Sequence, residues 1–175
     1  HTPRVADRLR EGLGAAPPMA PVVPPHQDVN MKITPIQVDG YEKVARAEDP
    51  ESGLIAFIAV HNTTLGPALG GMRLWPYDTE EAALTDVLRL ARGMTFKSSV
   101  ARTGLGGGKS VIVAKPELKS AALFEAMGRF VESFDGLYTT AEDVNVGIAD
   151  LEHVCRTTKH VTGLPREKGG SGNPS

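Results

Sequence analysis

The stretch Leu54-Ile-Ala-Phe-Ile-Ala-Val60 is a continuous apolar run of strand-forming residues. A run without polar alternation predicts a strand that is buried on both faces. Strands of this kind occur where helices cover both sides of a sheet. The run is also far too short to cross a bilayer as a helix. It therefore predicts the middle of a layered α/β domain.

Strand and helix patterns alternate on either side of this run. The sequence Asp78-Thr-Glu-Glu81 resembles a capping box, and an apolar stripe at three- and four-residue spacing follows it to about Val100. Pro116 can open a second helix. The other expected elements are an edge strand at 41–47, strands at 68–74, 110–114 and 137–140, and a third helix at 148–156. This order predicts a three-layer αβα domain with a mainly parallel, mixed sheet.

Composition limits the classes of function. The chain has 175 residues, a formal net charge of −2 and one cysteine, Cys155. Without a basic stripe, nucleic acid and anionic membranes are not expected partners. A lone thiol suits a reducing cytoplasm, and no metal is expected because no paired ligand spacing occurs. Prolines cluster near the start, so residues 1–30 are expected to be a disordered extension and 31–175 the domain.

The run Thr103-Gly-Leu-Gly-Gly-Gly-Lys-Ser110 is the first candidate for chemistry. A phosphate-binding loop needs glycine six residues before the lysine, and Thr103 stands there instead. The dinucleotide fingerprint fails as well, because Lys109 occupies the place of its third glycine. The run could be a flexible turn. Alternatively, its glycines remove bulk around Lys109, so that a small substrate reaches the amine through a narrow, desolvated opening.

Two further features accompany Lys109. Lys97 lies close to the buried stripe of the first helix, where it is either a surface lysine or a fixed cation for a carboxylate. The segment Thr139-Thr-Ala-Glu-Asp-Val144 ends an expected strand, so Asp143 either caps the next helix or handles a ligand. Two ammonium groups in one cleft disfavour double protonation, which would make one lysine a usable general base. Asp143 could then exchange protons with a substrate amine.

Several motifs in order resemble one enzyme family. They are His61-Asn-Thr-Thr-Leu-Gly-Pro-Ala-Leu-Gly-Gly71, Leu90-Ala-Arg-Gly-Met-Thr-Phe-Lys97, Gly106-Gly-Gly-Lys-Ser110, Thr140-Ala-Glu-Asp-Val144 and Gly170-Ser-Gly-Asn-Pro-Ser175. From about residue 40 onward, the chain resembles the glutamate/leucine/phenylalanine/valine dehydrogenases, most closely the leucine dehydrogenase branch. The resemblance implies an oxidoreductase that deaminates an amino acid to its 2-oxo acid and ammonia, with NAD as cofactor and a homo-oligomeric assembly.

The resemblance also implies roles for individual residues. Lys97 matches the lysine that binds the substrate α-carboxylate, and Lys109 matches the low-pKa lysine that activates water. Asp143 matches the aspartate that shuttles protons at the amine. The backbone of Gly70 and Gly71 matches the segment that lines the substrate.

Substrate specificity follows from two positions. Relatives that take glutamate place a lysine just before the paired glycines, and here Leu69 stands there. An unpaired carboxylate against this apolar wall would cost several kcal/mol, so leucine, valine or isoleucine is expected, with phenylalanine open. Ala141 matches another wall position, and its small size leaves room.

The resemblance further implies a Rossmann domain beyond Ser175 that holds NAD. This chain alone is therefore expected to bind an amino acid's polar end without turnover. One alternative is a non-catalytic binding or assembly module derived from the same family. A less favoured alternative is a phosphate-loop nucleotide binder centred on Lys109.

Overall fold

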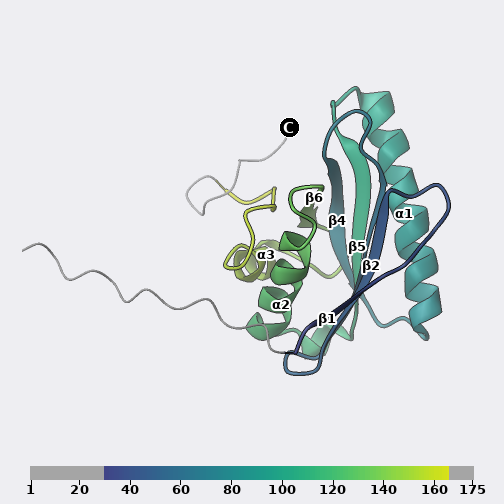
Figure 1. The fold of residues 1–175 in the computed structure, drawn as a ribbon. Helices are drawn as coiled ribbons and strands as arrows, with labels where there is room; N and C mark the ends of the chain where they lie inside the picture. The colour runs from purple at the N-terminus through teal and green to yellow at the C-terminus, as the bar shows by residue number, and fades with distance from the viewer. Residues whose placement is uncertain (1–29, 166–175) are drawn as a thin grey trace, which may run out of the picture.

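A computed structural model describes residues 30–165 as one six-stranded sheet with helices on both faces (Figure 1). The strands lie in the order β1-β2-β3-β5-β4-β6. The expected disorder of the first residues and the motif at 170–175 lie outside the described residues. The elements are β1 Lys32–Pro35, β2 Lys43–Asp49, β3 Leu54–Asn62, β4 Ala68–Trp75, α1 Glu80–Ala101, β5 Gly106–Val113, the 3-10 helix η2 Pro116–Leu118, α2 Ala121–Glu132, β6 Tyr138–Glu142 and α3 Ile148–Val154.

The three-layer α/β architecture is confirmed. Helix α1 lies along one face of the sheet, and α2 and α3 lie on the other (Figure 1). Two apolar clusters fill the layers: Phe57 and Val111 pack against Val87 of α1, whereas Ile58 and Ile112 belong to the cluster under α2 and α3. Strand β3 contributes side chains to both clusters, as its unbroken apolar run predicts.

The sheet is mixed, as expected, but the expectation of a mainly parallel sheet is wrong. Strand β4 pairs in parallel with β5 and β6, whereas β1 with β2, β2 with β3, and β3 with β5 are antiparallel. The chain passes from β2 to β3 by the short turn 50–53, and a turn of this length can only join antiparallel neighbours. The expected edge strand at 41–47 is β2, and the unforeseen β1 pairs with its outer side.

Helix boundaries follow from their caps. Thr79, and not Asp78, is the N-cap of α1, and its side chain accepts a hydrogen bond from the backbone N–H of Ala82. Pro116 opens only the short η2, and α2 begins after Ser120, whose hydroxyl accepts from the N–H of Leu123. No helix among residues 30–165 is long and apolar enough to cross a membrane.

The glycines before Lys109 lie within a strand and not in a loop. Gly106, Gly107 and Gly108 are buried in β5, which has β3 on one side and β4 on the other. A Cβ at Gly107 would overlap the backbone N and Oγ1 of Thr95 on α1, and one at Gly108 would lie 2.8 Å from the Tyr138 ring. Gly107 and Gly108 therefore serve close packing of α1 and Tyr138 against the sheet, and the expectation that the glycine run opens a path to Lys109 stays a prediction.

We predict that Gly107→Ala destabilises the chain, because the added methyl forces α1 away from β5. Overpacking of this kind costs about 1–3 kcal/mol. The matched control is Gly93→Ala on α1, where an added Cβ meets nothing within 4 Å. The control should be neutral or more stable, since alanine is the better helix former by up to about 1 kcal/mol. The free energy of unfolding in urea measures both changes, and equal values for the two variants would contradict the packing argument.

Candidate active site

The candidate site lies on the half of one sheet face that α1 leaves uncovered. Helix α1 packs chiefly on β5 and β3 and makes few contacts with β4. Side chains alternate between faces along a strand, so Leu69, Gly71 and Arg73 of β4 share the α1 side. Leu69 pairs with Thr139, and Gly71 pairs with Ala141 of β6. An open strip of sheet beside α1 thus carries three of the residues singled out from the sequence.

Lys109 and Asp143 meet on this strip. The Lys109 Nζ lies 2.9 Å from Oδ2 of Asp143, which directly follows the last residue of β6. Lys109 is only 5% exposed, although it is a lysine in the middle of a strand. Buried lysines are rare without a partner, so the carboxylate accounts for the burial of the amine. The structure therefore brings together the two residues that the sequence proposed for proton transfer.

Gly71 gives the ion pair its room. By the register of β4 against its neighbours, Gly71 lies between Lys109 on β5 and Ala141 on β6. A Cβ at Gly71 would lie 2.8 Å from Cβ of Asp143 and 2.6 Å from the carbonyl oxygen of Glu142. Because glycine has no side chain, Asp143 can lie close to β4, where Lys109 contacts it.

The turn that carries Asp143 is tied to the end of β4. The N–H of Leu74 donates to the carbonyl of Val144 at 3.1 Å, and the Asn145 side-chain amide donates to the carbonyl of Leu74 at 3.0 Å. Asn145 has a left-handed φ of 59°, which asparagine tolerates better than most residues. These bonds hold the turn, and with it the Asp143 carboxylate, against the end of β4.

Gly70 has a different role from Gly71. A Cβ at Gly70 would overlap the carbonyl oxygen of Gly108, so close packing of β4 and β5 requires this glycine. Its carbonyl accepts a 2.6 Å hydrogen bond from the hydroxyl of Tyr138, which is fully buried on the other side of the sheet. The same hydroxyl lies 3.0 Å from Oγ of Ser110. The backbone at Gly70 is therefore held rigidly.

Sequence reasoning missed a basic residue at the site. The Arg73 Nε donates to Oδ2 of Asp143 at 3.1 Å, and its Nη1 donates to Oδ2 of Asp86 on α1 at 3.0 Å. Tyr77 donates its hydroxyl to the same Asp86 oxygen at 2.6 Å. The available signal was period-two spacing, which puts Arg73 on the same face as Gly71.

The pKa of Asp143 lies below its ordinary value. Burial alone would raise it, because burial penalises the charged form. The hydrogen bond and positive charge of Lys109, the charge of Arg73 and a hydrogen bond from the Val144 backbone outweigh that effect. Asp143 is therefore held as a carboxylate.

Lys97 is exposed on α1, and the structure shows it in no ion pair within residues 30–165. The spacing Asp86, Leu90, Met94, Lys97 follows one line along the helix, so Lys97 lies on the same side of α1 as Asp86. That side faces Arg73 and the open strip. The structure thus places a solvated cation at the border of the strip, without contact to the ion pair.

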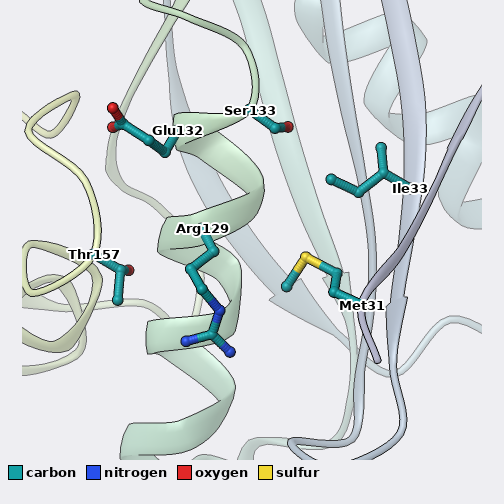
Figure 2. A pocket seen from close by; sticks show the side chains of 6 residues that line it. All are labelled: Met31, Ile33, Arg129, Glu132, Ser133 and Thr157. Atoms are coloured by element: carbon teal, nitrogen blue, oxygen red, sulfur yellow. The ribbon is translucent and has the colours of Figure 1, made fainter. Parts of the chain in front are cut away.

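Three hollows of the described surface can be located relative to the site. One of about 380 Å³ adjoins the site and is lined by Arg73, Trp75, Tyr77, Asp86 and Val144. A second lies on the other side of the molecule between β1 and α2, with Met31 and Ile33 facing Arg129 across it (Figure 2). A third, of about 500 Å³, lies along the start of α1 at Thr79, Ala82 and Asp86. Of these three, the first is lined by Arg73, which binds Asp143.

The described residues do not fit a bound nucleotide at the glycine run. Phosphate-binding loops present free backbone N–H groups at a helix N-terminus, whereas Gly106–Ser110 lies in a strand paired on both sides. In the same part of the chain, no group of three His, Cys, Asp or Glu side chains is arranged to hold a metal ion.

Comparison with known proteins shows which class of protein the chain belongs to. The fold matches the crystal structure of L-tryptophan dehydrogenase from Nostoc punctiforme with a TM-score of 0.68 and 48% identity, over 70% of this chain and 37% of that one. The chain is thus an amino-acid dehydrogenase domain. It belongs to the Glu/Leu/Phe/Val dehydrogenase family, whose dimerisation domain matches residues 41–160. The resemblance inferred from the motifs is confirmed.

Curated relatives give the same result. The chain is 54% identical to leucine dehydrogenase of Geobacillus stearothermophilus over 136 residues, which cover 77% of this chain and 37% of the relative. It is 46% identical to phenylalanine dehydrogenase of Lysinibacillus sphaericus over 151 residues, which cover 86% of this chain and 38% of that protein. The chain thus spans little more than a third of the length of these relatives.

We predict that Asp143→Asn removes an acid-dependent part of the stability. A carboxyl whose pKa is lowered on folding stabilises the fold above its unfolded value, about 3.9, and this contribution is lost as pH falls toward the folded value. The wild-type chain should therefore lose stability relative to the variant as pH falls below about 3.9. Unfolding free energies of both proteins between neutral pH and acid test this. A constant difference would contradict the ion pair. Glu117→Gln on the exposed η2 serves as the control.

Proposed function

We propose that the chain is the substrate-binding and catalytic-lysine part of an NAD-dependent dehydrogenase that oxidatively deaminates an aliphatic L-amino acid. The products are the 2-oxo acid and ammonia. The observation that carries the proposal is the buried Lys109–Asp143 pair on the open strip of sheet. Family membership supports it, because relatives named for leucine and phenylalanine match most of the chain.

The two residues divide the proton transfers. Asp143, as a carboxylate, accepts a proton from the substrate ammonium, so that the nitrogen lone pair can form the imine. NAD supplies the hydride acceptor when it is bound. Lys109 in its neutral form takes a proton from water, whose oxygen attacks the imine carbon. Asp143 then protonates the nitrogen and becomes a carboxylate again. As the C–N bond breaks and ammonia leaves, the hydroxyl proton passes to this carboxylate and the 2-oxo acid forms; Lys109 and Asp143 afterwards release their protons to water.

Three other residues are proposed to hold the substrate. Lys97 supplies a cation for the α-carboxylate from the border of the strip. Leu69 forms an apolar wall, and Ala141 leaves room beside Gly71. Leucine, valine or isoleucine is the proposed substrate, with phenylalanine as the alternative.

The complete protein is proposed to be a homo-oligomer that binds NAD through a further domain. The relatives extend far beyond the matched region, and the matching family domain is named for dimerisation. The derived non-catalytic module remains the competing hypothesis, and the absence of turnover by the complete protein would favour it.

We predict that Lys109→Ala lowers kcat of the complete protein with leucine by two to four orders of magnitude, the scale on which positioned acid–base groups act (~10²–10⁴-fold). The matched control is Lys115→Ala, since Lys115 is exposed beyond the end of β5. The control should keep its activity. NADH formation measures both, and near-normal turnover by the Lys109 variant would reject the assigned role.

We also predict that Leu69→Lys changes substrate choice. A lysine at this position would leave its ammonium against an aliphatic side chain but could pair with a side-chain carboxylate. We expect kcat/KM for leucine to fall and kcat/KM for glutamate to rise. Leu118→Lys on the exposed η2 is the control and should alter neither. If both ratios stay unchanged in the Leu69 variant, this residue does not line the substrate.

A further inference from the structure

Arg73 links two carboxylates that come from different parts of the fold. Its Nε donates to Asp143, in the turn after β6, and its Nη1 donates to Asp86, in the second turn of α1. The arginine itself stands on β4 between these elements, and its side chain is 21% exposed. Three elements around the open strip therefore meet at one guanidinium group.

The outer carboxylate is itself held in place. The Tyr77 hydroxyl donates to the Asp86 oxygen that also accepts from Arg73. The pKa of Asp86 lies below its ordinary value: burial opposes ionisation, but hydrogen bonds from Tyr77, Arg89 and Arg73 outweigh it. Asp86 is thus a fixed anion, and it sets the rotation of the guanidinium plane.

We propose that Arg73 is a positioning residue that aims the Asp143 carboxylate at Lys109 and keeps it charged, with Asp86 and Tyr77 as its brace. The inference rests on the proposed function, in which Asp143 must accept a proton from the substrate amine. It adds a residue to that site for which the sequence motifs gave no role.

The need for such a residue follows from the chemistry. When Lys109 is neutral and acts as a base, Asp143 loses the positive charge 2.9 Å away. Arginine does not deprotonate in proteins, so Arg73 remains a cation throughout the cycle. Asp143 is faced by Lys109 from β5 and by Arg73 from β4. Asp86 on α1 lies farther away, on the other side of Arg73, and burial raises the pKa of Tyr138 on β6, which keeps that hydroxyl neutral. Arg73 is the permanent cation among them.

The shape of the arginine side chain also suits the site. Its planar group presents Nε and Nη1 in fixed directions, and each is used for a different carboxylate. A lysine at position 73 has one nitrogen and can bind one of the two anions closely. Charge and orientation can therefore be separated by comparing Arg73→Gln with Arg73→Lys.

The first measurement needs no enzymatic activity. The 175-residue chain is labelled with carboxyl-¹³C aspartate, and the Asp143 signal is assigned by its loss in Asp143→Asn. We expect Arg73→Gln to raise the pKa of Asp143, because a permanent cation is removed. Arg73→Lys should raise it less. The matched control is Arg156→Gln, since Arg156 is 57% exposed and pairs with Glu125 of α2, which covers the other face of the sheet.

The second measurement is the pH profile of kcat for the complete protein with leucine. Arg73→Gln should lower kcat on the order of 100-fold, the effect of misplacing a reacting group by about 1 Å. The acid limb of the profile should move to higher pH in step with the Asp143 titration. Arg73→Lys should restore the position of this limb more than the size of kcat, and Arg156→Gln should leave both unchanged.

The outcomes separate this inference from the proposed function. An Asp143 titration that is the same in wild type and in both Arg73 variants overturns the positioning role, whatever the activity. A shifted titration with an unmoved pH profile also overturns it. If the wild-type protein does not oxidise leucine, the proposed function fails, and the titration still decides whether Arg73 holds the carboxylate. Should Arg73→Gln not fold, Arg73→Lys carries the same comparison.

Discussion

The open face depends on one missing side chain, that of Gly71. Asp143 can lie against β4, within 2.9 Å of the Lys109 Nζ, because Gly71 has no Cβ; an added carbon there would lie 2.8 Å from the Asp143 side chain. Withdrawing two charges from water costs several kcal/mol per ion, so such a pair persists only with good geometry and additional hydrogen bonds. Asp143 has these from Arg73 and the Val144 backbone. The ion pair is thus the inner end of a chain of charges that reaches α1.

Much of the fold could be predicted because its strongest signals are local. The run that forms β3 and the stripe of α1 each have one good solution, namely burial between layers or along one face. The start of β5 could not be predicted, because glycine is a poor strand former and Gly106–Gly108 has no apolar pattern. Thr95 of α1 and Tyr138 of β6 occupy the space on the two faces at Gly107 and Gly108, and that requirement is tertiary.

The site was predictable to the extent that residue type and position carried it. Lys109 and Asp143 were expected near each other, and the structure pairs them. Arg73 was not expected, because a single arginine on the partly exposed face of a strand is usually a solvated surface residue. Only the contact with Asp86, thirteen residues later on α1, distinguishes it. The sequence around Arg73 does not indicate a partner that lies on another element.

Under the proposed function, the register of the sheet puts the proton-transfer residues and the substrate side-chain wall in different rows. Ligands of parallel α/β sheets usually lie at the carboxyl ends of the strands, and only Asp143 obeys that rule here. Lys109 lies in the middle of β5, so the site extends from the strand ends onto the uncovered face. One row across the sheet holds Lys109, Gly71 and Ala141, and the next holds Leu69, two residues or about 6.6 Å earlier on β4. That spacing suits an amino acid whose polar end meets the first row while its side chain meets the second. Under the proposed function, changes at Leu69 can therefore alter the substrate while the proton-transfer row stays intact.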